Sequence, residues 1–161
     1  MTKTLTPQRV NLITLGVEDL SRSRAFYEAL GWVAADEAPG VVFFRMQGAA
    51  LGLFGKADLA KDQGREGAPL GTGAMTLAQN FQDQAGVDAA FAAALAAGAT
   101  ALKQPEEVFW GGYSGYYADP DGHVWELAYN PFWTVNDDGS LTIPEQGADA
   151  EAEDTKGPAP E

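Results

Sequence analysis

The residues best suited to chemistry lie in one stretch, from Val108 to Pro131, which reads VFWGGYSGYYADPDGHVWELAYNP. Glu126 is the isolated carboxylate in this stretch. In an apolar pocket it would act as a general acid or base, or it would pair with a cationic ligand. The structural alternative is a carboxylate satisfied by nearby polar groups, because an unpaired buried charge is costly. The sequence leaves both interpretations open.

A second candidate is the loop of glycines and aromatic residues before Glu126. Its glycines let the backbone approach a bound molecule closely, and its rings offer flat apolar faces. A ligand with a flat or apolar surface is the natural match, whereas the alternative is that the rings fill a small core or a dimer interface. The aromatic residues are Trp110, Tyr113, Tyr116 and Tyr117, with Phe132 and Trp133 beyond the last strand as candidates for a dimer contact or a lid.

Other reactive side chains are scarce. His123 is the single histidine, so the chain cannot form a site with two histidine ligands. Because side chains alternate along a strand, His123 points away from Glu126, and we interpret it as a polar residue that follows a turn. The absence of cysteine excludes disulfides, thiolate metal sites and cysteine nucleophiles. Phosphate loops, nucleotide fingerprints and nucleophile elbows are also missing, and Ser114 lacks a His–Asp arrangement.

A hairpin is predicted to position the candidate residues. Its turn is Asp119-Pro120-Asp121-Gly122, in which proline fixes φ, the aspartates bond to nearby backbone N–H groups and glycine accepts a positive φ. Its arms, 113–118 and 123–129, are rich in the aromatic and β-branched residues that favour strands.

The order βαβββ occurs twice along the chain, with a period of about 65 residues, which indicates a domain of two modules. The first module is predicted as a strand at 9–17 covered on both faces, a helix at 21–30 ended by Gly31, and strands at 32–35, 41–46 and 49–54. The second is predicted as a strand at 74–81, a helix at 86–97 ended by Gly98, a short strand at 100–103 and the hairpin.

These elements divide the chain of 161 residues into a polar lead, one domain and an extension. The ranges are 1–8 for the lead, 9–133 for the domain and 134–161 for the extension, which contains a short strand at 141–143 and a disordered acidic tail from about residue 144. Within the domain, module one covers about 9–55, a linker covers 56–73 with helical fragments at 56–62, and module two covers 74–133.

Two segments, VNLITLGVEDLSRSRAFYEALGW and GYYADPDGHVWELAYNP, resemble the vicinal oxygen chelate superfamily, which is the glyoxalase I, bleomycin-resistance and extradiol dioxygenase group. The most specific piece is DPDGHVWEL, which is similar to the DPDGNxxEL signature of that family. The resemblance implies an α+β fold in which two βαβββ modules form an open, curved, eight-stranded mixed sheet, a cup with helices on its convex face. It also implies a ligand in the concave face and a homodimer.

Relatives that use a metal place one ligand on the first strand and one on the last strand of each module, usually His or Glu. Carried over to this sequence, these positions read Leu12, Gly52, Thr76 and Glu126, so only one retains a metal-binding side chain of the usual kind. The resemblance therefore implies no cofactor and no strong metal site. A weak divalent cation on Glu126 and nearby oxygens stays open.

The leading hypothesis is a metal-independent, bleomycin-resistance-like protein that binds a small, partly aromatic or cationic molecule in the cup. The alternative is a lyase, isomerase or dioxygenase-like enzyme with Glu126 as a base or a metal ligand, and a third interpretation is a dimerisation or scaffold module. The predicted ligand-binding residues are Trp110, Tyr113, Tyr116, Thr14, Thr76, Asn80 and Arg45, of which the last four are also the candidate polar neighbours of Glu126.

The net charge of −13 argues against two classes of partner. Nucleic acids and anionic membranes both repel an acidic protein, so neither is expected to bind. No apolar run reaches the roughly 20 residues of a membrane helix, and the start MTKTLTPQRV lacks the hydrophobic segment of a signal peptide. The cytoplasm is the expected location.

Overall fold

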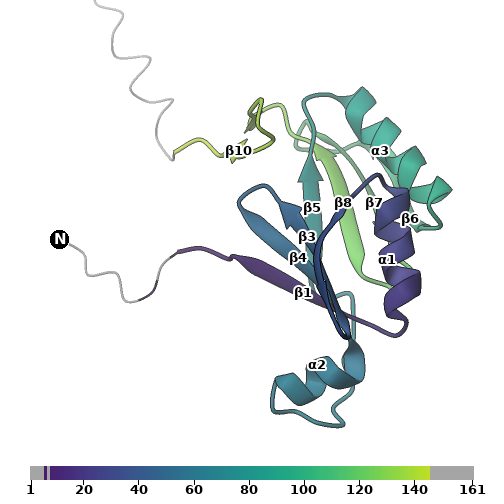
Figure 1. The fold of residues 1–161 in the computed structure, drawn as a ribbon. Coiled ribbons are helices and arrows are strands. Elements are labelled where there is room, and N and C mark those ends of the chain that lie inside the picture. Colours follow the sequence, from purple (N-terminus) through teal and green to yellow (C-terminus); the bar gives the residue numbers. More distant parts are fainter. Residues whose placement is uncertain (1–5, 7, 146–161) are drawn as a thin grey trace, which may run out of the picture.

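The structure is a computed structural model of the chain, and it describes residues 6 and 8–145. The predicted α+β fold with two βαβββ modules is confirmed (Figure 1). The first module contains β1 (Leu12–Val17), α1 (Leu20–Ala29), β2 (Ala34–Ala38), β3 (Val41–Met46) and β4 (Ala49–Gly55). The second contains β5 (Thr76–Asn80), α3 (Gln84–Ala96), β6 (Thr100–Glu107), β7 (Tyr113–Ala118) and β8 (Val124–Tyr129). Helix α2 (Lys56–Asp62) lies between the modules, and a small hairpin of β9 (Thr134–Val135) and β10 (Leu141–Thr142) follows them.

Each module forms a four-stranded mixed sheet, and the two sheets have the same topology. Their orders are β1-β4-β3-β2 and β5-β8-β7-β6, with parallel pairing of β1 with β4 and of β5 with β8. Along the described chain no hydrogen-bonded ladder joins the sheets, so the eight strands form two sheets of four. The internal repeat seen in the sequence is therefore a repeat of topology.

Local sequence signals explain where the two long helices begin and end. The Asp19 carboxylate accepts a hydrogen bond from the Arg22 amide at the start of α1, and Asp83 caps α3 in the same way. Gly31 and Gly98 follow the helices with φ of 90° and 106°, the left-handed conformation that favours glycine. On the buried face of α1, Tyr27 is fully buried, whereas Ala25 is exposed on the other side of the helix.

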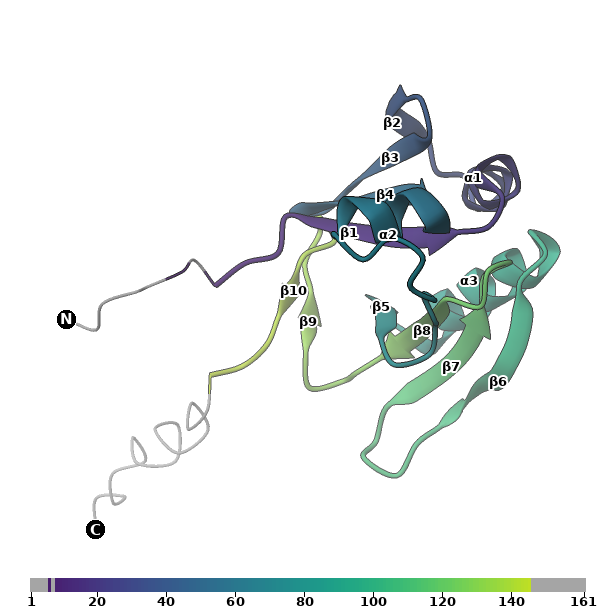
Figure 2. The same cartoon turned by 90° about the horizontal axis from the view of Figure 1, so that it is seen from below.

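Both modules bury side chains in one shared core. Tyr27 of α1 lies at its centre, with ring centroids 6.0 Å from Phe44 in the first sheet and 6.1 Å from Trp125 in the second. Phe26 likewise contacts Tyr117 of β7, at 6.3 Å. Figure 2 shows α1 and α3 on the same side of the molecule. Each sheet therefore turns one face toward the helices and the shared core, and its other face points away from that core. The buried members of the core are Leu15, Val17, Phe26, Tyr27, Val42, Phe44, Leu51, Leu53, Val87, Phe91, Ala94, Tyr117, Trp125 and Leu127.

Two predictions about strands were wrong. Strand β1 is covered on both faces only near its end: Leu15 and Val17 are buried on the core side and Gly16 is buried beside α2, but Leu12, on the same face as Gly16, is 47% exposed. Strand β6 extends to Glu107 instead of ending at Lys103. It continues past Pro105 because it is an edge strand, where a residue without an N–H is tolerated, and its pairing with β7 is irregular there.

Other boundaries are closer to the prediction. Helix α2 has the predicted range 56–62, both arms of the hairpin form, and β2 starts two residues later than predicted, at Ala34. The predicted lead and acidic tail fall almost entirely outside the described residues. None of the helices in the described part has the length and apolar character needed to cross a bilayer.

Candidate functional site

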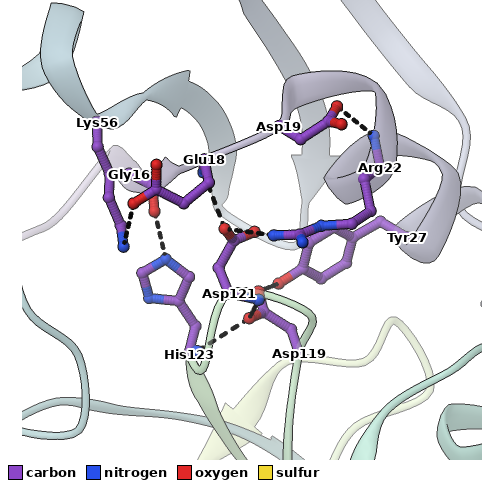
Figure 3. A network of polar contacts seen from close by, with 9 residues as sticks. All are labelled: Gly16, Glu18, Asp19, Arg22, Tyr27, Lys56, Asp119, Asp121 and His123. Atoms are coloured by element: carbon purple, nitrogen blue, oxygen red, sulfur yellow. Dashed lines mark hydrogen bonds and ion pairs between the residues drawn. The ribbon is translucent and has the colours of Figure 1, made fainter.

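The turn in the DPDG signature connects the two modules (Figure 3). Asp119 is 3% exposed, and its Oδ1 accepts hydrogen bonds from the backbone amides of Asp121 and His123, each at 2.9 Å. Its Oδ2 accepts a hydrogen bond of 2.6 Å from the Tyr27 hydroxyl, which in turn accepts one from Trp125 Nε1 at 3.2 Å. Burial, and then the negative charge of Asp119, raises the pKa of Tyr27 well above its ordinary value, so its hydroxyl keeps its proton.

Two further residues, one in the turn and one directly after it, contact the first module. The side chain of Asp121 is fully enclosed, and its Oδ1 accepts hydrogen bonds from Arg22 Nη2 at 3.0 Å and from the Glu18 amide at 2.9 Å. Nε2 of His123 lies 2.7 Å from the Gly16 carbonyl oxygen, and it carries the hydrogen because a carbonyl can only accept. These contacts support a structural role for His123 and for the signature turn.

Glu126 lies on the face of the second sheet that points away from the core. Its neighbours Trp125 and Leu127 are buried in the core, whereas Glu126 is half-buried on the opposite face. Tyr116 of β7 and Ala78 of β5 are its partners in the two adjacent strands. Burial raises the pKa of Tyr116, and the Glu126 carboxylate raises it further as a negative neighbour and hydrogen-bond acceptor. Tyr116 is therefore a neutral donor beside a carboxylate.

Thr76 and Asn80 lie on the same face as Glu126, because they are two residues before and after Ala78 on β5. Together with Tyr116 and Glu126 they form what we call the second-sheet patch. The structure thus brings together these four predicted site residues: Thr76, Asn80, Tyr116 and Glu126.

The other predicted residues lie elsewhere. Thr14 and Arg45 occupy the outward face of the first sheet, where Thr14 pairs with Gly52 and Arg45 with Ala50; we call this face the first-sheet patch. Tyr113 lies on the core side of β7, and its hydroxyl donates a 2.6 Å hydrogen bond to Asp88 of α3. Trp110 is in the loop between β6 and β7 and is 38% exposed.

The positions that carry metal ligands in relatives have equivalent geometry in the two modules. Leu12 pairs with Ala50, so it is two residues out of register with Gly52. Thr76 pairs with Val124, so it is also two residues out of register with Glu126. These positions are therefore structurally equivalent, even though their side chains differ from the usual metal ligands.

The side chains at these positions do not fit a metal. A Cβ atom on Gly52 would lie 3.2 Å from the Phe43 ring and 3.4 Å from Thr14 Oγ1, so any side chain at this position would be crowded by Phe43. Leu12 is aliphatic, and Thr76 offers only a neutral hydroxyl. Across the described residues, no group of three or more His, Cys, Asp or Glu side chains could hold a metal ion. The donor set retains Glu126 alone.

Sequence reasoning missed two residues that shape these surfaces. Tyr27 joins the modules, and it shares the buried face of α1 with the polar residue Ser23, so hydrophobic periodicity does not single it out. Phe43 fills the space beside Gly52, and only the pairing of β3 with β4 places it there. No signal in the linear sequence indicates that contact.

The chain is an α+β protein of two βαβββ modules. The last strand of its second module, β8, carries the Glu126 carboxylate on its outward face. The chain belongs to the Glyoxalase/Bleomycin resistance protein/Dioxygenase superfamily, whose family model matches residues 9–127. No curated protein matches the chain.

Solved structures agree with this family. A glyoxalase-related enzyme from Fulvimarina pelagi is 37% identical, with a TM-score of 0.80 over 86% of this chain and 100% of that one. A structure described as lactoylglutathione lyase from Agrobacterium tumefaciens is 27% identical, with a TM-score of 0.60 over 77% of this chain and 95% of that one. A family enzyme from Burkholderia phytofirmans PsJN, at 19% identity and a TM-score of 0.66 over 74% and 96% of the chains, shares the fold.

Proposed function

We propose that the protein binds a small, partly aromatic or cationic molecule at the second-sheet patch without a metal ion. The observation that carries this proposal is the pairing of Glu126 with Tyr116 on the outward face. A carboxylate attracts a cation, and an adjacent tyrosine ring offers a face for a cation or an aromatic group. Thr76 and Asn80 add hydrogen-bonding groups on the same face.

Metal independence is supported by the chemistry of the donor set. One carboxylate with neutral oxygens binds a divalent ion weakly, because tight sites for transition metals need several imidazole, thiolate or carboxylate ligands. We expect the purified, desalted protein to contain far less than one equivalent of zinc, nickel, iron or manganese by elemental analysis. A stoichiometric metal that survives desalting would contradict the proposal.

We also propose that the protein is a homodimer. The first-sheet and second-sheet patches belong to different sheets and both point away from the shared core. A second copy would let the Thr14 face of one chain meet the Glu126 face of the other. Exposed apolar side chains would be covered by such contacts, among them Phe109, Phe132 and Leu12. Light scattering should then give the mass of two chains, whereas the mass of one chain would argue against this assembly.

A second candidate function is catalysis, which is favoured by the similarity to the structure described as lactoylglutathione lyase. In this case Glu126 would move a proton to or from the bound molecule, with the Tyr116 hydroxyl as its hydrogen-bond donor. Glu126→Gln distinguishes the two functions. If the protein is a catalyst, the variant should still bind a neutral substrate but should no longer turn it over. If it is a binding protein, the variant should lose affinity for a cationic ligand.

A further inference from the structure

A pocket of about 440 Å³ lies where α2 and the following connection, residues 63–75, pass the outward end of β1. Leu59, Leu70 and Met75 provide apolar parts of its lining, and two cations, Lys56 and Arg65, provide its charge. It borders the first-sheet patch through Thr14 and does not include Glu126. The residues that line this pocket therefore differ from those of the second-sheet patch.

The charge of this pocket is opposite to that of the whole protein. The chain carries a net charge of −13, yet no Asp or Glu is among the described residues that line the pocket. Arg65 donates its hydrogen bond of 3.3 Å to the neutral side chain of Gln63. The guanidinium charge is therefore not neutralised by that partner.

Lys56 has one competing partner. Its Nζ lies 3.1 Å from Glu18 Oε1, and the side chain of Glu18 is 68% exposed (Figure 3). An ion pair with such an exposed partner contributes little free energy, so an anion that binds more tightly in the pocket can displace Glu18 from Lys56. His123, tied to the Gly16 carbonyl, forms a fixed wall near the lysine.

We propose that this pocket binds a small organic carboxylate. Its anionic group lies between Lys56 and Arg65, and its apolar body packs against Leu59, Leu70 and Met75. Charge-assisted hydrogen bonds to ammonium and guanidinium groups fix the carboxylate, and burial of the apolar body adds affinity. This binding is independent of the function proposed for Glu126.

The probe for this site is benzoate, with its neutral isostere benzamide as the comparison. In a two-dimensional ¹⁵N NMR titration, benzoate should shift the amide signals of residues 56–75 in a saturable way. Benzamide should bind on the order of tenfold more weakly, which corresponds to the loss of one charge-assisted hydrogen bond. Added salt should weaken benzoate binding more than benzamide binding.

Charge variants test the assignment of the two cations. Lys56→Gln and Arg65→Gln should each weaken benzoate binding by about tenfold. Glu18→Gln should tighten it, because the competing carboxylate is removed. Lys61→Gln is the matched control, since Lys61 is exposed on the same helix but does not line the pocket. The NMR spectra also show whether each variant remains folded.

Three results would overturn the proposal: equal binding of benzoate and benzamide, shifts confined to another surface, or no saturable shift at millimolar benzoate. An equal loss of affinity in Lys61→Gln and Lys56→Gln would also overturn it, because the effect would then reflect net charge. Failure at this pocket leaves the Glu126 proposal unaffected, since the two sites share no charged residue.

Discussion

Replacement of Trp125 by alanine is expected to lower the free energy of unfolding by about 4 kcal/mol, the usual range for a buried tryptophan. Trp125 is 4% exposed and makes three aromatic contacts, of which those with Trp32 and Tyr27 join the second module to the first. It stacks on Tyr117 at 6.3 Å, meets Trp32 edge-on at 5.6 Å and contacts Tyr27 at 6.1 Å. Its removal leaves a cavity between the modules and removes the hydrogen bond that Trp125 Nε1 donates to the Tyr27 hydroxyl.

Urea denaturation followed by circular dichroism measures this loss. The matched control is Trp133→Ala, because Trp133 is 37% exposed and lies outside the shared core. The control should cost less than about 1 kcal/mol, as is usual for a surface substitution. A similar small loss for Trp125→Ala would mean that the modules are not held together by this core.

Asp119→Ala is expected to lower the free energy of unfolding by about 3 kcal/mol. The substitution removes the acceptor of three hydrogen bonds, from the Tyr27 hydroxyl and from the amides of Asp121 and His123. Buried donors left without a partner lose their full desolvation energy, which is why the loss exceeds that of an ordinary hydrogen bond. Asp138 is the matched control, because it accepts from Ser140 in an exposed turn and its replacement should cost much less.

A double-mutant cycle isolates the bond between the modules. Tyr27→Phe removes the same 2.6 Å hydrogen bond from the other side, so the losses from Tyr27→Phe and Asp119→Ala should not add. The folded chain raises the pKa of Tyr27, so this residue's contribution is complete below the ordinary tyrosine pKa of about 10 and declines as the pH rises above it. Full additivity in the cycle would show that the bond does not couple the modules.

The hairpin and the helix ends were predictable because their signals are local. Proline, aspartate and glycine determine the turn at Asp119, and the glycines after the helices determine where those helices end. The turn also sets the register of the two arms. Because Ala118 pairs with Val124, Tyr116 pairs with Glu126, and Tyr113 lies on the opposite face of the sheet. The sequence interpretation placed both tyrosines in one site without using this pairing.

The arrangement of the modules was not predictable from local signals. The contact of Tyr27 with Trp125 joins residues 98 positions apart, and it determines that both sheets face one shared core. The first-sheet and second-sheet patches are separated for the same reason. Lys56 and Arg65 lie in a segment without periodicity, so only the fold brings them together with Leu70 at one pocket.

We expect Glu126 to bind a cationic aromatic molecule without a metal. The most direct measurement is the thermal unfolding of EDTA-treated protein with the probe benzyltrimethylammonium, for the unmodified chain and for Glu126→Gln. The control is Glu66→Gln, which removes the same charge at an exposed position of the connection. A ligand that binds only the folded state raises the midpoint temperature. The midpoint temperature should rise for the unmodified chain and for Glu66→Gln but not for Glu126→Gln. An equal rise in all three proteins, no rise in any of them, or a rise that appears only after zinc or manganese is added, would contradict metal-free binding at Glu126.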